Sequence, residues 1–343
     1  ILFFDFMKTL LLYSEKFLLH NNETHPENAN RLTHTLDFLK SSGIYDKLEL
    51  VDPEPMSYED LSEVHSTYMI DRVIEADKNG DWLDLDTYVC RGSYDIARLA
   101  AGGLYKVCRE VIQEKADDSF ALVRPPGHHA TSTRSMGFCL FNNVALAAYH
   151  IGKEGKKVLI FDHDVHHGNG TQEIFYKNDK VLYQSIHLSP HYPGTGKIEE
   201  IGEEVGIGYT INAPLIHGIG DETVKEIMNE IMFPIARQFK PDLIIVSAGF
   251  DSHHADMLGG LSLTANIYPW FIENLRKIQP RIVCSLEGGY NYEWLGKCIA
   301  LEIKSLLGER DYEIDDRVYG ERNDYSRNLI KDLRKLLGEY WEL

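Results

Sequence analysis

Short apolar runs rich in β-branched residues alternate along this chain with longer segments of helical periodicity. The runs predict strands at residues 8–13, 120–123, 158–161, 181–186, 209–212, 243–247 and 282–285. Helical periodicity predicts helices at residues 94–114, 142–153, 221–239 and 267–277. Apolar strands separated by helices are typical of a parallel sheet covered by helices on both faces. Such sheets bind ligands at the carboxyl ends of their strands.

Composition narrows the class of protein. The chain has 343 residues, 43% hydrophobic, which is long enough for one sizeable core. Its five cysteines are scattered and form no Cys-x-x-Cys pair, which indicates reduced thiols and a cytoplasmic location. The formal charge of −18 disfavours nucleic acids and anionic membranes and suits cationic ligands, although acidity also serves solubility alone. No uninterrupted apolar stretch approaches the roughly 18 residues of a membrane span.

Residues 161–170, Phe-Asp-His-Asp-Val-His-His-Gly-Asn-Gly, directly continue the predicted strand 158–161. Asp162, Asp164 and His166 occupy alternate positions, so their side chains point the same way if the strand continues. Carboxylates and an imidazole on one side of a strand end are ligands for a divalent metal. The alternative is a polar turn with capping residues.

Three further polar motifs each follow a predicted strand. Arg-Pro-Pro-Gly-His-His-Ala (124–130) places His128 and His129 on a rigid turn, where histidines can exchange protons or be merely structural. Ser-Ala-Gly-Phe-Asp-Ser-His-His (247–254) places Asp251 where a strand-end ligand would lie, or where a helix cap would. Glu-Gly-Gly-Tyr-Asn (287–291) offers the hydroxyl of Tyr290 beside a flexible glycine pair, unless Tyr290 is a core residue.

Together the four motifs supply two carboxylates and one imidazole for a metal, two histidines for proton transfer and a tyrosine donor. Three protein ligands with an open coordination position describe a catalytic zinc site. The same ligands also suit ferrous iron.

These motifs resemble those of the zinc-dependent histone deacetylase family, which includes acetoin-utilisation-type deacetylases and acetylpolyamine amidohydrolases. The resemblance runs from about residue 13 to residue 307. The motifs occur there in the same order as in the family: Arg-Pro-Pro-Gly-His-His, Gly-Phe-Cys with Phe-Asn-Asn, Asp-His-Asp-Val-His-His-Gly-Asn-Gly, Pro-Gly-Thr-Gly, Ala-Gly-Phe-Asp and Glu-Gly-Gly-Tyr. The resemblance implies a single α/β domain with a central, mainly parallel eight-stranded sheet and helices on both faces, the fold shared with arginases. It also implies hydrolysis of acetyl or other acyl groups on lysine side chains.

The resemblance implies roles for individual residues. The metal ligands would be Asp164, His166 and Asp251. His129 would be the general base, His128 its electrostatic support, Asp162 the partner of His128, and Tyr290 the donor to the developing oxyanion. The residues at the substrate tunnel would be the aromatic walls Phe138 and Tyr192, the flanking Leu258, the narrow-point glycines Gly137 and Gly289, and the rim acid Asp86. Arg31 would lie near an internal cavity below the metal.

Family members also hold structural potassium ions. One site would use the side chains of Asp162 and Ser185 with the carbonyls of Asp164, His166 and Ile186. A second would use carbonyls near Phe175, Val181 and Tyr209.

Three positions depart from common family patterns. Asn169 replaces an aspartate behind the second histidine, which suits a base and points to the class II-like branch. Tyr192 replaces a phenylalanine, and Leu258 replaces the acidic gatekeeper expected of polyamine specialists.

Other functions remain open at this point. The closest is an acetylpolyamine amidohydrolase, which the negative charge permits. A manganese ureohydrolase shares the fold but requires a second metal. A non-catalytic acyl-lysine binding module would be expected to lose a ligand, a histidine or the tyrosine. The substrate partner is thus an acetylated lysine peptide or protein, or an acetylated polyamine.

The chain changes character after Gly308. Residues 309–324 are dense in charge, and an apolar stripe at helical spacing follows, formed by Leu329, Ile330, Leu333, Leu336, Leu337 and Trp341. We expect a deacetylase catalytic domain over residues 7–308. We expect residues 309–343 to form a charged segment and an amphipathic helix packed on that same domain, with a partner site as the alternative.

Overall fold

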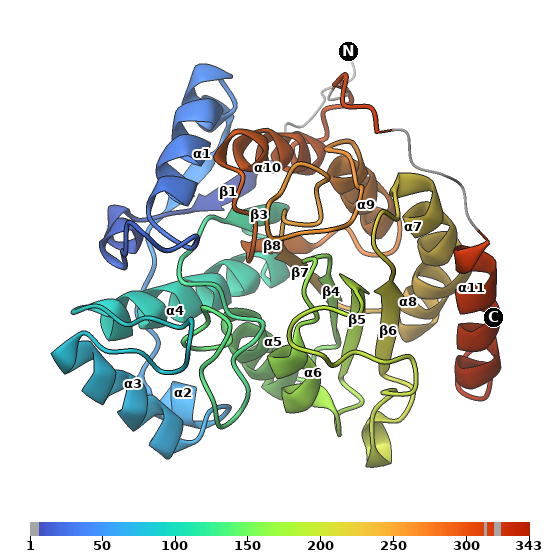
Figure 1. Cartoon of the computed structure of the whole chain (residues 1–343), viewed down its shortest axis with the longest axis horizontal. Helices are drawn as coiled ribbons and strands as arrows, with labels where there is room; N and C mark the ends of the chain where they lie inside the picture. Colours follow the sequence, from blue (N-terminus) through green and yellow to red (C-terminus); the bar gives the residue numbers. More distant parts are fainter. Residues whose placement is uncertain (1–6, 312–313, 319–323) are drawn as a thin grey trace.

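The computed structural model describes residues 7–311, 314–318 and 324–343. Within these residues one sheet of eight parallel strands runs through the molecule in the order β2-β1-β3-β8-β7-β4-β5-β6 (Figure 1). The predicted α/β fold with an eight-stranded sheet is confirmed, and every strand pairing is parallel. The strands are β1 (Thr9–Leu12), β2 (Glu49–Val51), β3 (Asp118–Ala121), β4 (Val158–Asp162), β5 (Val181–Leu188), β6 (Thr210–Leu215), β7 (Leu243–Ala248) and β8 (Ile282–Leu286).

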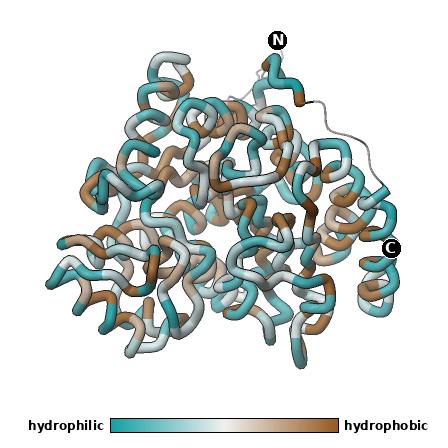
Figure 2. The backbone as a smooth tube through the Cα atoms, viewed as in Figure 1, coloured by the Kyte–Doolittle hydropathy of each residue, from teal (hydrophilic) through white to brown (hydrophobic). Residues whose placement is uncertain are grey.

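Helices cover both faces of the sheet. The α-helices are α1 (Asn30–Ser41), α2 (Tyr58–Ser62), α3 (Thr67–Asn79), α4 (Ser93–Ile112), α5 (Asn143–Lys153), α6 (Asn169–Phe175), α7 (Asp221–Ile227), α8 (Phe233–Phe239), α9 (Ile267–Arg276), α10 (Tyr292–Leu306) and α11 (Tyr325–Leu337). Short 3₁₀ helices are η1 (Glu15–Leu19), η2 (Tyr45–Lys47) and η3 (Glu204–Gly206). Figure 1 shows α1, α9 and α10 on one side of the strands and α4, α5 and α6 on the other. Hydrophobic residues concentrate between these layers, and hydrophilic ones dominate the outer loops (Figure 2).

Two local features differ from the sequence prediction. The helix expected at 221–239 contains a π-helical turn, η4 (Met228–Met232), between α7 and α8. Pro234, in the first turn of α8, has no amide hydrogen to donate to a carbonyl of the preceding turn, which explains the widened turn. The edge strand β2 was not predicted, because its three residues carry no recognisable pattern.

The carboxyl ends of four adjacent strands lie level with one another. Ala121 of β3 pairs with Ser285 of β8, Ser285 pairs with Ser247 of β7, and Ser247 pairs with Asp162 of β4. The four polar motifs leave the sheet just beyond this row. Their convergence on one edge, as predicted, is therefore a consequence of parallel pairing in this register.

Helix α11 packs against α7 at the edge of the molecule (Figure 1). Its apolar stripe is buried at Leu329, Ile330, Leu333 and Leu337. The indole Nε1 of Trp341 donates to the carbonyl of Gly208 at 2.7 Å. Residues 312–313 and 319–323 of the expected charged segment lie outside the described residues. Among the helices of the described chain, none has both the length and the apolar character needed to cross a bilayer.

Candidate metal centre and active site

Asp164, His166 and Asp251 meet at the carboxyl edge of the sheet. His166 Nδ1 lies 3.0 Å from Asp164 Oδ1 and 3.2 Å from Asp251 Oδ2, and the donor atoms of the three residues lie within 4.8 Å of one another. The hydrogen bond of His166 Nδ1 goes to Asp164, and within the described residues the buried Oδ2 of Asp251 accepts none. A buried carboxylate oxygen without a donor is costly unless a cation compensates it, so the three residues fit a divalent metal ion.

Backbone amides hold the two carboxylates in place. The amide of Gly288 donates to Asp164 Oδ2 at 2.8 Å, and the amide of Val165 donates to Asp251 Oδ1 at 2.9 Å. Gly288 lies so close that a Cβ there would stand 2.2 Å from Asp251 Oδ2 and 2.6 Å from Asp164 Oδ2. The loop after β8 therefore holds Asp164, the loop after β4 holds Asp251, and Gly288 packs closely against both carboxylates.

Replacing Gly288 by alanine is expected to push both carboxylates apart and to weaken metal binding about 10- to 100-fold, the usual cost of disturbing the support of metal ligands. The measurement is a competition titration against a chelating dye. The control is Gly152→Ala in α5, where an added Cβ meets no atom within 4 Å. Equal affinities in the two variants would contradict the placement of Gly288.

The tandem histidines stand beside this trio. His128 Nδ1 donates to Asp162 Oδ2 at 3.1 Å, and His129 Nδ1 lies 2.8 Å from Asn169 Oδ1. Because an amide oxygen only accepts, the hydrogen of His129 is on Nδ1, and Nε2 keeps a free lone pair. Burial and the neighbouring rings of His128 and His166 lower the pKa of His129 well below its usual value. His129 is thus arranged as a neutral proton acceptor.

A pocket of about 220 Å³ opens above these groups. Its lining residues are Asp86, Pro126, His128, His129, Gly137, Phe138, His166, His191, Tyr192, Leu258, Gly288 and Tyr290. Burial raises the pKa of the Tyr290 phenol well above its usual value, so the hydroxyl remains a donor. The pocket brings together most of the residues expected at the substrate tunnel.

One expected tunnel residue lies elsewhere. Gly289 is not among the lining residues, and a Cβ added to it would face Leu295 and Phe250 in the interior. Its neighbour Gly288 takes the lining position. The positive φ of Gly289 (+117°) explains instead why this position requires glycine.

Sequence reasoning also missed His191, whose ring stacks on that of His166 at 4.8 Å. Its Nε2 donates to the carbonyl of Leu258 at 3.1 Å, which ties two walls of the pocket together. The available signal was its position next to Tyr192, between two prolines.

Arg31 is fully buried below the β8 loop. Its Nε donates to the carbonyl of Gly289 at 2.7 Å, and its guanidinium lies 5.0 Å from the ring centroid of Tyr290. The residue expected near an internal cavity therefore supports the loop that carries Tyr290.

The residues expected at potassium sites fall into two groups. Asp162 and Ser185 are paired across β4 and β5, close to Asp164, His166 and Ile186 in the chain. Asp162 Oδ2 already accepts from Tyr183 at 3.0 Å as well as from His128. The second group stands at element ends, with Phe175 closing α6, Val181 opening β5 and Tyr209 just before β6.

The fold and pocket define a class: parallel α/β proteins with a pocket and a candidate metal-ligand group at the carboxyl ends of the strands. Residues 25–306 match the histone deacetylase domain family. A probable deacetylase of Archaeoglobus fulgidus is 37% identical, over 98% of this chain and 99% of the relative. The rice (Oryza sativa subsp. japonica) protein "Histone deacetylase 10, chloroplastic" is 38% identical, over 84% of this chain and 71% of the relative. The crystal structure of the HDA15 HD domain superposes with a TM-score of 0.92 at 35% identity, covering 98% of this chain and 95% of that one.

This chain belongs to the histone deacetylase family. Membership supports a deacetylase, a hydrolase acting on an acetylated substrate. Members are generally metal-dependent, in agreement with the group Asp164, His166 and Asp251, which could hold a metal ion beside the pocket.

Proposed function

We propose that this protein is a zinc-dependent amidohydrolase that removes acetyl or other acyl groups from lysine side chains. The observation that carries this proposal is a pocket lined by His129, Tyr290 and His166, in which His166 also belongs to the candidate metal-ligand group with Asp164 and Asp251. A pocket of about 220 Å³ suits a slender acylated alkyl chain better than a bulky ligand.

The residues divide the chemistry between them. Zinc, or ferrous iron, bound by Asp164, His166 and Asp251 would supply Lewis acidity to a carbonyl and to a water molecule. His129 Nε2 accepts the proton of the water that attacks the acyl carbon, while Asn169 holds the ring in the required tautomer. When the C–N bond breaks, the same proton passes to the leaving amine.

The remaining pocket residues orient the substrate and stabilise charge. Tyr290 donates a hydrogen bond to the acyl oxygen as negative charge develops there. His128, paired with Asp162, contributes positive electrostatic potential: burial opposes its protonation, but the carboxylates of Asp164 and Asp162 raise its pKa to about 10. Phe138 and Tyr192 exclude water from the alkyl chain, and Asp86 is positioned to accept from substrate amides at the rim.

An acetylpolyamine amidohydrolase is the second candidate, favoured by the formal charge of −18. A side-by-side assay after reconstitution with zinc or ferrous iron separates the two. We expect a higher kcat/KM for an acetyl-lysine peptide than for acetylspermidine, because Leu258 adds no charge to the pocket. A reversed ratio would identify the polyamine enzyme, and no turnover of either substrate would refute both.

We further propose the domain bounds, the role of potassium, the location and the partners of the protein. Residues 7–308 form the catalytic domain, and the described parts of the segment that follows, residues 314–316 and helix α11, pack on it. Potassium ions at the two predicted sites have a structural role. The free cysteines favour a reducing compartment such as the cytoplasm, although two relatives carry the word chloroplastic in their names. From the net negative charge we expect no direct contact with nucleic acid and no binding to membranes.

A further inference from the structure

A short segment near the C-terminus lies across the loop that carries Asp251. The side-chain amide of Asn266 pairs with the backbone of Ile314, donating to its carbonyl at 3.0 Å and accepting from its amide at 3.1 Å. Asp316, two residues after Ile314, accepts at Oδ2 from the amide of Ala265 at 2.7 Å. Residues 314–316 are therefore held by specific polar contacts to the start of α9.

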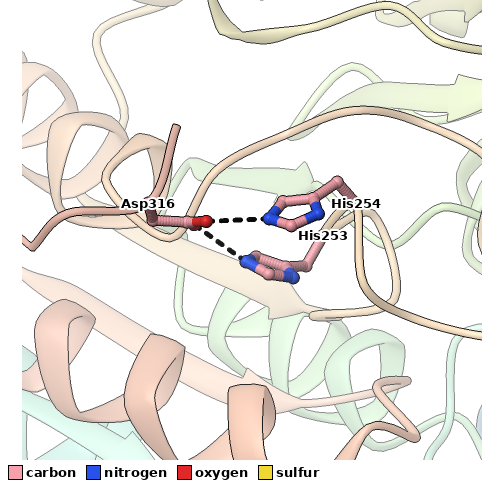
Figure 3. A group of neighbouring side chains, drawn as sticks. All are labelled: His253, His254 and Asp316. Atoms are coloured by element: carbon pink, nitrogen blue, oxygen red, sulfur yellow. Dashed lines mark hydrogen bonds and ion pairs between the residues drawn. The ribbon is translucent and has the colours of Figure 1, made fainter. Parts of the chain in front are cut away.

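Asp316 also joins this segment to two histidines that the proposed mechanism does not use (Figure 3). His253 Nε2 lies 3.0 Å from Asp316 Oδ2, and His254 Nε2 lies 2.7 Å from Asp316 Oδ1. Asp316 and His253 are buried, whereas His254 is partly exposed. The ring of His253 stacks on Trp294 of α10 at 4.4 Å, which fixes its orientation.

Two histidines and a carboxylate also have the composition of a metal site, and their donor atoms lie within 4.8 Å of one another. The hydrogen bonds favour another interpretation. The amide of Ala255 donates to His253 Nδ1 at 3.2 Å, so this nitrogen carries no hydrogen and Nε2 must carry it. A nitrogen that carries a hydrogen can donate to the carboxylate of Asp316, but it has no lone pair left to bind a metal. His253 Nε2 is therefore a hydrogen-bond donor to Asp316.

The loop fastened in this way, residues 251–258, reaches three parts of the active site. It begins at Asp251, the proposed metal ligand. Asp256 Oδ2 accepts from the amides of Tyr290 at 2.6 Å and Asn291 at 2.9 Å. Leu258 lines the pocket and accepts from His191. A shift of this loop would therefore displace the proposed metal ligand Asp251, the backbone of Tyr290 and the pocket wall at Leu258.

We propose that Asp316 is a positioning residue: through His253 and His254 it holds the 251–258 loop in the geometry that the deacetylase site requires. Its effect on turnover rests on the proposed function, but its effect on the loop does not. The C-terminal segment thereby becomes part of the active-site support, although Asp316 touches no substrate.

The test compares Asp316→Asn with Asp315→Asn. Both lose one carboxylate charge, but the side chain of Asp315 is 83% exposed and pairs only with Arg317 among the described residues. In Asp316→Asn an NH₂ group replaces one carboxylate oxygen and faces either His254 or the donors His253 and Ala265, so at least one hydrogen bond accepted by the carboxylate is lost. We expect faster hydrogen–deuterium exchange in peptides covering 251–258, a changed visible spectrum of the cobalt-substituted protein, and kcat about 10- to 100-fold lower. We expect KM to change less than kcat, and Asp315→Asn to match the wild type in every measurement.

A second pair of variants covers the case in which Asp316→Asn does not fold. His254→Gln keeps a side-chain donor near Asp316 and is expected to retain most activity, whereas His254→Leu removes the donor and is expected to lower kcat. Equal exchange and equal kcat in Asp316→Asn and Asp315→Asn would overturn the proposal. So would two zinc ions per wild-type chain with one lost in Asp316→Asn, because the cluster would then be a metal site. If the wild type hydrolyses no acyl-lysine substrate, the proposed function fails, and the exchange measurement alone still decides the role of Asp316.

Discussion

Replacing Tyr290 by phenylalanine is expected to lower kcat about 100- to 1,000-fold, the usual cost of losing one donor to a developing oxyanion. The variant loses only the hydroxyl. Its ring still contacts the guanidinium of Arg31 at 5.0 Å and the ring of Phe138 at 5.9 Å, so folding should be preserved. Metal content should also be unchanged, because Tyr290 is not one of the ligand residues. The measurement is steady-state kinetics on an acetyl-lysine peptide beside a metal assay.

Tyr292→Phe is the matched control for this variant. Tyr292 lies two residues away and does not line the pocket; its hydroxyl accepts from Asn28 at 2.8 Å. We expect its kcat to equal that of the wild type. A Tyr290→Phe variant as active as the control would remove Tyr290 from the mechanism.

Replacing Glu27 by glutamine is expected to destabilise the protein by about 3–5 kcal/mol, the usual cost of breaking a buried ion pair from one side. Glu27 and both of its arginine partners are fully buried. Its carboxylate accepts from Arg124 Nε and Nη2 and from Arg31 Nη1. Glutamine would leave two buried guanidinium groups facing a neutral amide. Chemical denaturation monitored by circular dichroism measures the loss.

The pH dependence of this contribution has a definite sign. Burial alone would raise the pKa of Glu27, but Arg124 and Arg31 outweigh it and lower the pKa to about 2. The stabilisation is therefore complete above the unfolded value, near pH 4.5, and is lost as the pH falls towards 2. Glu75→Gln is the control, because the exposed carboxylate of Glu75 has only surface contacts with Lys78 and Asn79 among the described residues and its loss should change stability little. Equal stability of the two variants at pH 7 would show that the buried network is dispensable.

The sheet and the candidate metal ligands can both be predicted from the sequence, because both depend on recognising buried parallel strands. Apolar runs such as 158–161 and 243–247 mark buried parallel strands, and parallel strands present their carboxyl ends on one edge. Asp164 and Asp251 could thus be assigned to one site although 87 positions separate them in the numbering. The family resemblance added the roles of Phe138 and Tyr192, which no local pattern indicates.

Contacts that span long distances without periodicity were not predictable. Strand β2 is defined only by pairing with β1, where Leu11 faces Leu50. Asp316 lies in a charged segment like any other, and only the folded chain brings it to His253. The ordering of Tyr290 by Asp256 likewise depends on a loop whose shape no strand or helix pattern encodes.

The central claim is that the four polar motifs meet around one cation. Its most direct test is a metal titration of the metal-free protein with hydrolysis measured in parallel. We expect one tightly bound ion per chain, activity that rises in proportion to occupancy, and loss of both in Asp251→Ala. Full hydrolytic activity of the metal-free chain, or unchanged ion binding in Asp251→Ala, would contradict the account.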